Sequence, residues 1–273
     1  MHFRKDVTDM KLGFIGCGNM ATAILGGILK KQLLQPEEII VSALHQETLD
    51  RAAKAYRVHT TLDNREAALA DIVFLAVKPQ FYQQVIEEIK DTVTQDQIIV
   101  SIAPGKTIET ITSWFGKQVK LVRTMPNTPA MVGEGVTAVC PSDAVTKEEL
   151  QKVLTYLECC GIAEVMSEHL LDAVVSVSGS SPAYVFMFIE ALADGAVRDG
   201  IPRSQAYRLA AQAVLGSAKM VLETGKHPGE LKDMVCSPAG TTIEAVAALE
   251  KAGFRDAVLS GMKACTDKTK SIR

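Results

Sequence analysis

A glycine-rich turn follows the first apolar run of the chain. It has the sequence Gly16-Cys17-Gly18-Asn19-Met20-Ala21, which is G-x-G-x-x-A, and a helical apolar pattern follows it. In this motif the first glycine permits a tight turn, the second lets the backbone approach a pyrophosphate, and the small third residue lets the helix pack on the sheet. The first N–H groups of the helix then face the anion. The turn predicts a dinucleotide site, and a glycine-rich turn without function is the alternative.

The end of the next predicted strand bears on the choice of dinucleotide. NAD-binding proteins usually place an acid there for the ribose 2′-hydroxyl. This chain has Ser42-Ala43-Leu44-His45 instead, and the nearest acid is Glu47. A 2′-phosphate needs hydrogen-bond donors, and a serine hydroxyl supplies one. We therefore expect NADP, with NAD as the second choice, and contacts from Ser42 and from His45 or Arg51, although those two cations are equally well explained as solvated surface groups.

Two other strand ends carry candidate cofactor contacts. The segments are Ala76-Val77-Lys78-Pro79 and Ser101-Ile102-Ala103-Pro104-Gly105. In a doubly wound sheet, ligands bind outside the carboxyl ends of the strands. Both segments therefore fit a cofactor crevice, but Lys78 is equally well explained as a surface lysine that flanks a helix.

A second candidate anion site begins a helix in the other half of the chain. Its sequence is Cys236-Ser237-Pro238-Ala239-Gly240-Thr241-Thr242-Ile243-Glu244. We expect Thr241 and Glu244 to form a capping box. The glycine before the helix leaves N–H groups open to a small carboxylate, and the hydroxyls of Ser237 and Thr242 can donate hydrogen bonds or pass a proton. A helix cap without function is the alternative. In the preceding segment, Ser176–Tyr184, a similar helix start is predicted, with Ser180 or Ser181 as the cap.

The elements that position these residues fall into two halves. Up to about residue 166, six apolar runs alternate with helical stretches and predict strands at Lys11–Ile15, Ile39–Ala43, Ile72–Val77, Ile98–Ile102, Lys120–Arg123 and Val136–Cys140. Continuous apolar strands separated by helices indicate a parallel sheet covered on both faces. The remainder predicts helices broken at Gly179–Pro182, Gly200–Pro202, Gly225–Gly229 and Pro238–Gly240. We expect an α/β, Rossmann-type doubly wound sheet over residues 10–166, an all-helical domain over 167–273 and a ragged tail over 1–9.

Composition narrows the class of protein further. The 273 residues are 47% hydrophobic and 22% charged, as in ordinary globular proteins. The net charge of -3 provides no single-signed field, so neither nucleic acid nor an anionic membrane is expected as a partner. The six cysteines contain no C-x-x-C pair, and the five histidines have no metal spacing, so we expect reduced thiols, a cytoplasmic protein and no metal site.

Two apolar runs resemble membrane or export segments. The run from Leu12 to Leu29 contains five glycines, and that from Ala173 to Ile189 contains Pro182 and four serines. Both suit folded protein better than a membrane span. Within the second, Ala183–Val197 is apolar almost all round, which predicts burial between subunits and hence a homodimer or a higher homo-oligomer.

Six segments in chain order resemble those of pyrroline-5-carboxylate reductase, and the likeness extends from about residue 11 to the C-terminus. They are Gly13–Ala21, Ala76–Pro79, Arg123–Pro129, Ser178–Tyr184, His227–Asp233 and Ser237–Thr242. The resemblance implies reduction of 1-pyrroline-5-carboxylate to L-proline by NAD(P)H, the last step of proline biosynthesis. It also implies an active site between one chain's cofactor domain and the helical domains of two chains.

The resemblance also implies which residues bind. Contacts to the cofactor fall on Ile15, Gly16, Cys17, Gly18, Asn19, Met20, Ser42, Asn64, Ala76, Val77, Lys78 and Pro79, and Ala103 follows from its place after a strand. Contacts to the substrate fall on Gly240, Thr241 and Thr242, with Glu168 and Ser237 close by. The chain departs from the pattern at Pro104 and Met234, where some members have alanine and asparagine. Neither departure affects the pyrophosphate turn, but both weaken the prediction of contacts to the nicotinamide.

Reduction of an imine does not require a strong acid from the protein. The nicotinamide supplies the hydride, so the protein has to orient the reactants, bind the carboxylate and exclude water. The imine proton comes from solvent or from the hydroxyl of Thr242, which we take as the catalytic residue. Two alternatives are a 3-hydroxyacid or 6-phosphogluconate type dehydrogenase and a non-catalytic NADP-binding protein. The first needs a lysine beside an asparagine in the helical domain, and neither Lys219 nor Lys232 has that setting.

Overall fold

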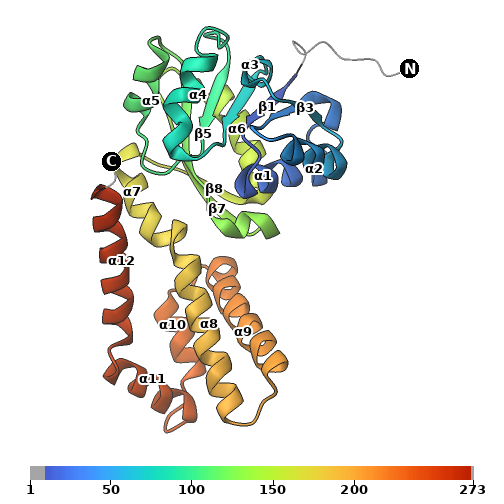
Figure 1. Ribbon diagram of the computed structural model, residues 1–273. Coiled ribbons are helices and arrows are strands. Elements are labelled where there is room, and N and C mark those ends of the chain that lie inside the picture. The colour runs from blue at the N-terminus through green and yellow to red at the C-terminus, as the bar shows by residue number, and fades with distance from the viewer. Residues whose placement is uncertain (1–9, 272–273) are drawn as a thin grey trace. The chain divides into compact units, whose positions relative to one another are not determined.

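The computed structural model describes residues 10–271, so the predicted tail over 1–9 lies outside the described residues. The described chain separates into two compact units (Figure 1). The α/β unit runs up to Gly179 and includes the residues from Thr266 onward, and the helical unit comprises Ser180–Cys265.

An eight-stranded sheet forms the centre of the α/β unit, in the order β3-β2-β1-β4-β5-β6-β7-β8. The strands are β1 (Leu12–Ile15), β2 (Ile39–Ser42), β3 (His59–Thr61), β4 (Ile72–Leu75), β5 (Ile98–Ser101), β6 (Lys120–Met125), β7 (Gly135–Pro141) and β8 (Gly161–Val165). All six predicted strands are present, within two residues of their predicted ends. The predicted Rossmann-type doubly wound sheet is confirmed, and it is parallel except for one pair of strands.

One strand pair departs from the predicted parallel arrangement, because β7 runs antiparallel to β6. Only the short helix η4 (Thr128–Val132) lies in the link between them. A parallel crossover needs about a dozen residues or more, and this link is shorter. The chain therefore turns back beside β6, and β8 then pairs parallel to β7 after the crossover through α6 (Lys147–Leu157).

Two strands were not predicted, and both lie at the edges of the sheet. The three residues of β3 are half-buried, and β8 has Ile162 and Val165 each 50% exposed. An edge strand has one neighbour and only partial cover, so its residues carry little of the continuous apolar signal that marks a central strand.

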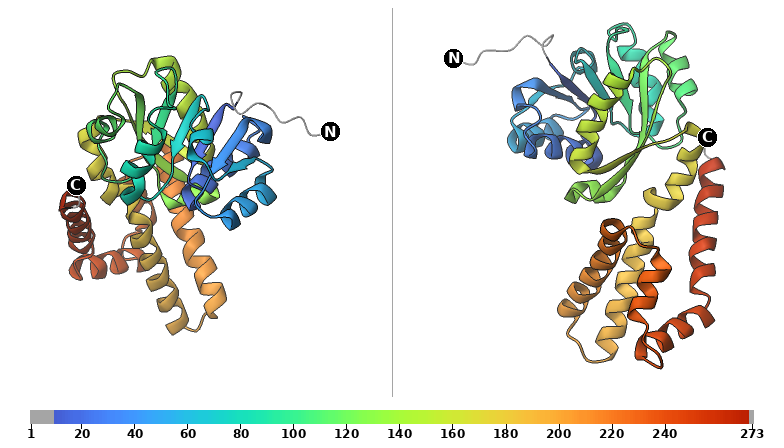
Figure 2. Two further views of the ribbon diagram at one scale, coloured as in Figure 1. Left: turned by 45° about the horizontal axis from the view of Figure 1, so that its top comes forward. Right: turned by 180° about the vertical axis from the view of Figure 1, so that it is seen from behind.

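Helices cover the sheet on both faces (Figures 1 and 2). On one face, α1 (Asn19–Lys30), α6 and the short helix η5 (Glu158–Cys160) pack on side chains such as Phe14 and Phe74. On the other face, α3 (Asn64–Ala67), α4 (Tyr82–Ile89) and α5 (Ile108–Phe115) pack on Ile15, Val73 and Ile99. The remaining helical segments of the unit are η2 (Pro36–Glu38), α2 (Gln46–Tyr56), η3 (Pro79–Phe81), η6 (Glu168–Leu170), α7 (Leu171–Val174) and the π-helical turn η7 (Val175–Gly179).

The helical unit contains no strand among its described residues, as predicted. Its helices are α8 (Ser181–Arg198), α9 (Arg203–Thr224), α10 (Pro228–Val235), α11 (Thr241–Lys251) and α12 (Phe254–Ser271), the last of which extends beyond the unit. All four predicted breaks are present, and a further break that was not predicted separates α11 from α12 at Gly253, which has φ +77. The helices α8 and α9 approach closely because alanines form the centre of their contact, namely Ala193, Ala206 and Ala210.

The helical unit leaves large apolar side chains exposed. Phe186 and Met187 on α8 are 64% and 69% exposed, and Leu222 on α9 is 77% exposed. By length and composition alone, the helical stretch Glu168–Arg198 could cross a membrane, a test that core helices of soluble proteins also pass. An exposed apolar face of this size indicates an interaction surface.

Candidate active site

The first glycine of the predicted dinucleotide turn has the backbone geometry that the motif requires. Gly16 follows β1 with φ +98, a conformation that side chains other than glycine's rarely adopt. A Cβ at this position would lie 2.7 Å from the carbonyl oxygen of Ala76 and 2.9 Å from the backbone nitrogen of Val77. The turn therefore packs directly against the predicted cofactor segment that follows β4.

The second glycine leaves the start of α1 open. Gly18 is the N-cap of α1 without a side-chain capping bond, and a Cβ added to it would meet no atom within 4 Å. The first turn of α1 carries no acidic residue, while the third motif position, Ala21, is buried against the sheet. Free N–H groups, open space and a positive helix end fit a phosphate group. The residues of this turn thus fit the pyrophosphate of a dinucleotide.

Strand register brings the predicted cofactor segments to one edge of the sheet. The last residue of β1, Ile15, is in register with Ser42 of β2 and with Leu75 of β4, and Leu75 is in register with Ser101 of β5. The chain continues from β1 toward β2 on one side and from β4 toward β5 on the other, which makes the β1–β4 boundary the point where strand order reverses. Ligands of such sheets bind in the crevice at that point.

The cysteine in the turn stays a neutral thiol. Burial raises the pKa of Cys17 and outweighs the opposing effects of the hydrogen bond with Thr22 and of the nearby Arg51. A thiolate here would repel phosphate, so the raised pKa suits an anion site.

Ser42 does not present its hydroxyl to a ligand. It is fully buried, and its Oγ donates to Oδ1 of Asn64 at 2.8 Å and lies 3.4 Å from the carbonyl oxygen of Phe14. The Nδ2 of Asn64 in turn donates to Glu88 at 2.9 Å. The predicted contact of this hydroxyl with a 2′-phosphate stays a prediction, and in this arrangement internal hydrogen bonds use the hydroxyl.

Arg51 is the better-placed candidate for a phosphate contact. It is exposed on α2 and lines a hollow of about 260 Å³ together with Cys17, Asn19 and Thr48. Two of these residues belong to the predicted cofactor set. His45, the other candidate, is exposed at the N-cap of α2.

In the helical unit, the predicted substrate residues form a tight turn before α11. The backbone N–H of Gly240 donates to the carbonyl oxygen of Ser237 at 3.1 Å, with Pro238 second in the turn and Ala239 third at φ +57. This is the pattern of a type II turn, whose third position favours glycine. A Cβ on Gly240 would overlap the hydroxyl of Ser237, so the glycine lets that hydroxyl approach the start of the helix.

The expected capping box at this helix is wrong. The N-cap is Gly240, extended at φ -80, and Thr241 is already the first helical residue. A capping box needs its hydroxyl on the N-cap, which places Thr241 one position too late to bond the third N–H. Because glycine provides no capping side chain, the first N–H groups of α11 have none, and half-buried Thr242 lies among them.

Glu168 is separate in sequence from the other predicted substrate residues and belongs to the α/β unit. Its Oε1 accepts hydrogen bonds from the backbone N–H of Ile108 at 2.7 Å and from Nη1 of Arg123 at 2.8 Å. The side chain of Arg123 is 4% exposed, and its Nη2 lies 3.7 Å from Oδ1 of Asp172. Sequence reasoning missed this cluster, although an arginine at the end of the predicted strand Lys120–Arg123 was an available signal. Contact of Glu168 with the substrate stays a prediction.

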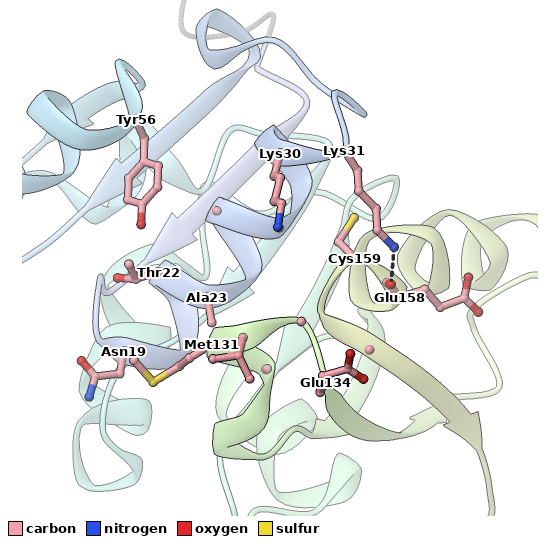
Figure 3. Close-up of a pocket in the computed structure, with 16 residues that line it drawn as sticks. Asn19, Thr22, Ala23, Lys30, Lys31, Tyr56, Met131, Glu134, Glu158 and Cys159 are labelled. Carbon is pink, nitrogen blue, oxygen red and sulfur yellow. Dashed lines mark hydrogen bonds between the residues drawn. The ribbon is translucent and has the colours of Figure 1, made fainter. Parts of the chain in front are cut away.

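A cavity of about 680 Å³ runs along α1 on the side of Met131 and Glu158 (Figure 3). Asn19 and Thr22 lie at one end, and Lys31 lies at the other, where its Nζ donates to the backbone oxygen of Glu158 at 2.9 Å. Of the predicted cofactor residues, only Asn19 lines it. The cavity is therefore distinct from the crevice at the carboxyl ends of the strands.

Family models match both parts of the chain. Residues 11–105 match the family described as NADP oxidoreductase, coenzyme F420-dependent. Residues 168–272 match the family described as pyrroline-5-carboxylate reductase dimerisation. The first match covers the glycine-rich turn and the strands that flank the crevice, and the second covers the turn before α11.

Relatives and solved structures agree along almost the whole chain. A pyrroline-5-carboxylate reductase of Escherichia coli is 50% identical over 97% of this chain and 98% of that protein, and one of Methanosarcina acetivorans is 40% identical over the same shares. The structure of a pyrroline-5-carboxylate reductase from Coxiella burnetii matches with a TM-score of 0.91 at 36% identity, over 96% of this chain and 98% of that one. A Plasmodium falciparum pyrroline carboxylate reductase with NADP bound matches with a TM-score of 0.86 at 31% identity, over 97% and 98%. The chain belongs to the pyrroline-5-carboxylate reductase family.

Proposed function

We propose that this protein reduces 1-pyrroline-5-carboxylate to L-proline with NADPH, in the last step of proline biosynthesis. One hydride adds to the imine carbon and one proton adds to the imine nitrogen, which gives the secondary amine of proline. The observation that carries the proposal is the family relationship over 97% of the chain, at 50% identity to a reductase of that name. The two open helix starts, on α1 and α11, supply a site for each of the two anionic reactants.

The cofactor is held along the carboxyl edge of the sheet. The backbone from Ile15 to Met20 binds the pyrophosphate, and Asn64, Ala76–Pro79 and Ala103 line the crevice on either side of it. Ser42 acts indirectly, because its hydroxyl orients the amide of Asn64. The bound cofactor supplies the hydride. We assign the preference for NADP to Arg51 and His45, whose positive or donor groups suit a 2′-phosphate, since no acid occupies the end of β2.

The substrate carboxylate is held at the start of α11. The backbone N–H groups of Thr241 and Thr242 donate to it, and the hydroxyl of Ser237 adds a third donor beside Gly240. The support for this role is a helix start with no capping side chain and a hydroxyl held against its N-cap. Two neutral amides and a positive helix end stabilise a carboxylate without an arginine.

Thr242 is the residue that we assign to proton transfer at the imine nitrogen. An imine accepts a hydride more readily once its nitrogen is protonated or hydrogen-bonded, and a hydroxyl can donate that bond and be reprotonated from solvent. Glu168 completes the predicted substrate set, and its carboxylate is already paired with Arg123. Its place in the substrate set rests on the family relationship, because the hydrogen bonds that the structure shows for its carboxylate come from Arg123 and from the backbone N–H of Ile108.

The protein acts as a homodimer or a larger homo-oligomer in the cytoplasm. We assign cofactor binding to residues 10–166, and substrate binding and pairing with a second chain to residues 167–273, of which 167–179 and the end of α12 belong to the compact α/β unit. Support comes from the match of residues 168–272 to a dimerisation family and from the exposed apolar side chains of α8. The start of the stretch Glu168–Arg198 is held on the sheet, because Arg123 pairs with both Glu168 and Asp172. We therefore propose that a second copy of the chain, and not lipid, covers this stretch.

The test is a turnover assay that follows the loss of NADPH absorbance with 1-pyrroline-5-carboxylate. It is repeated with NADH and with a 3-hydroxyacid plus NADP. We expect turnover with the imine, a higher kcat/KM for NADPH than for NADH, and no reaction of the hydroxyacid. Cofactor binding without turnover of the imine would contradict the proposed reaction and leave only the nucleotide-binding role.

A further inference from the structure

Three polar side chains meet inside the α/β unit, and none of them has a part in the proposed reaction. We call Tyr82, Ser101 and Thr124 the Tyr82 network. Tyr82 begins α4, has no exposed surface, and donates its hydroxyl to the carbonyl oxygen of Leu75 at 2.5 Å. The hydroxyl of Ser101, also fully buried, donates to the Tyr82 oxygen at 3.3 Å. The hydroxyl of Thr124 donates to the carbonyl oxygen of Ser101 at 2.9 Å.

The network joins the carboxyl ends of β4, β5 and β6. Leu75 is the last residue of β4 and directly precedes Ala76–Pro79. Ser101 is the last residue of β5, and its Oγ lies 3.5 Å from the backbone N–H of Ala103, which donates to it. The oxygen of Tyr82 thus lies between two segments that both belong to the proposed cofactor site.

Fully buried hydroxyl groups need a reason at this position. An unpaired hydroxyl away from water is costly, and an apolar side chain of the same shape would serve packing alone. The ring of Tyr82 already packs with Val85 and Ile86 in the core of this face of the sheet. Burial raises the pKa of Tyr82 well above its usual range, so the hydroxyl keeps its proton and remains a donor to Leu75.

We propose that Tyr82 is a positioning residue for the cofactor. Its hydroxyl, acting through Leu75 and Ser101, fixes the separation between Ala76–Pro79 and the Ala103 loop before the cofactor binds. The inference rests on the proposed function, because it takes those two segments as cofactor contacts. Without the hydroxyl, the two segments can move apart in the free protein. Cofactor binding then has to order them, and the free energy of that ordering lowers the affinity for the cofactor.

The experiment measures the Kd of NADPH by titration calorimetry for the wild type, Tyr82→Phe, Ser101→Ala and the double variant. Tyr82→Phe keeps the ring and removes only the hydroxyl. We expect each single variant to raise Kd by about fivefold, the effect of one lost hydrogen bond. The Kd of the double variant should be about equal to the higher of the two single-variant Kd values, because both substitutions remove the same link. The kcat at saturating NADPH should stay within about twofold of wild type, since the affected groups do not touch the reacting atoms.

A buried polar side chain at the opposite end of the same two strands provides the matched control. Gln97, just before β5, donates from Nε2 to the carbonyl oxygens of Ala68 and Ala70 at 2.6 and 2.7 Å, and its Oε1 accepts the backbone N–H of Thr94 at 2.7 Å. Gln97→Met should lower the melting temperature by as much as Tyr82→Phe or more and leave the Kd of NADPH unchanged.

The outcomes separate the proposal from the function on which it rests. Wild-type protein that does not bind NADPH would overturn the proposed function, and this is known before any variant is compared. If the wild type binds, unchanged Kd values for Tyr82→Phe and Ser101→Ala would show that the hydroxyls serve stability alone. An equal rise in Kd for Gln97→Met would overturn the proposal in the same way, because any destabilisation would then weaken binding.

Discussion

In the α/β unit, the apolar side chains of the sheet lie between two layers of helices, and residues such as Phe14 and Phe74 have no exposed surface. In the helical unit, only small residues such as Ala193 and Ala206 are buried, while Phe186 and Met187 face outward. Burying a large apolar side chain stabilises by about 1.5–3 kcal/mol, so leaving several exposed is costly for a chain on its own. The apolar side chains of the first unit are covered within one chain. Those of the second unit are exposed in the way expected for one side of an interface between subunits.

The same contrast holds for the two turns that we propose to bind anions. The turn before α1 packs against a second strand end, and Gly16 has no room for any side chain. The turn before α11 is held by its own hydrogen bond from Gly240 to Ser237 and by an alanine in a left-handed conformation. We therefore expect the first turn to depend on the fold around it and the second to depend on its own sequence.

The largest effect should come from paired substitutions in the α/β unit. Gly16→Ala puts a Cβ at φ +98 against the backbone of Ala76, which should lower the free energy of unfolding by about 2–3 kcal/mol and abolish NADPH binding. Gly18→Ala meets no atom within 4 Å, so it should leave the melting temperature unchanged and still weaken NADPH binding. Calorimetry and cofactor titration measure both quantities. Full NADPH affinity in Gly18→Ala would contradict the proposed approach of the pyrophosphate.

The helical unit should be sensitive to charge on its exposed apolar face. Met187→Glu on α8 should weaken subunit association by at least about a hundredfold, in the range of interface hot spots, and should reduce turnover with it. Light scattering should then give a mass near the 29.4 kDa of one chain. The matched control is Leu33→Glu in the α/β unit, where an apolar side chain 38% exposed is replaced by the same charge. A wild-type protein of single-chain mass would contradict the proposed homo-oligomer.

A smaller effect is expected from the hydroxyl at α11. Thr242→Ala should lower kcat/KM by at least about tenfold, which is a loss of about 1.4 kcal/mol of transition-state stabilisation. Thr242→Ser keeps the hydroxyl and should recover most of the activity. Steady-state kinetics with varied 1-pyrroline-5-carboxylate decides the matter. An unchanged kcat/KM in Thr242→Ala would reduce this side chain to a part of the helix start.

The smallest effect compares one strained residue in each unit. Ala239 has φ +57 in the turn before α11, and Arg57 has φ +59 at the C-cap of α2. Each residue pays a steric penalty that glycine avoids, partly offset by glycine's greater freedom in the unfolded chain. Ala239→Gly and Arg57→Gly should each raise the free energy of unfolding by about 0.5–1 kcal/mol, read from urea unfolding of the protein. A lower free energy of unfolding in either variant would show that glycine's greater freedom in the unfolded chain outweighs the relief of the steric penalty.

Central strands and helix breaks could be predicted from the sequence because each has a strong local signal. The strands β1, β2, β4 and β5 are fully buried and mostly apolar, and the breaks in the helical half occur at glycine and proline. The edge strands β3 and β8 were missed because their residues are only partly covered and carry no continuous apolar signal. The capping box was misplaced by one residue because Gly240 and Thr241 both suit a helix start, and only backbone geometry separates them.

The candidate site residues also divide into those that a local signal predicts and those that depend on contacts distant in the sequence. The glycines of the first turn follow from the motif, since positive φ and close approach restrict the choice of residue there. The use of the Ser42 hydroxyl by Asn64, and the pairing of Glu168 with Arg123, depend on residues 22 and 45 positions away. No local pattern carries that information.

By itself, the sequence determined the α/β and helical halves, the glycine-rich turn, the order of motifs and the family, because each depends on local periodicity or on residue types at fixed spacing. The tertiary structure decided the antiparallel β7, the internal bonds of Ser42 and Glu168, the N-cap at Gly240 and the Tyr82 network. Those features depend on which strand ends lie side by side and on which hydroxyls are buried. Such contacts join distant parts of the chain, and their hydrogen bonds form only where folding excludes water.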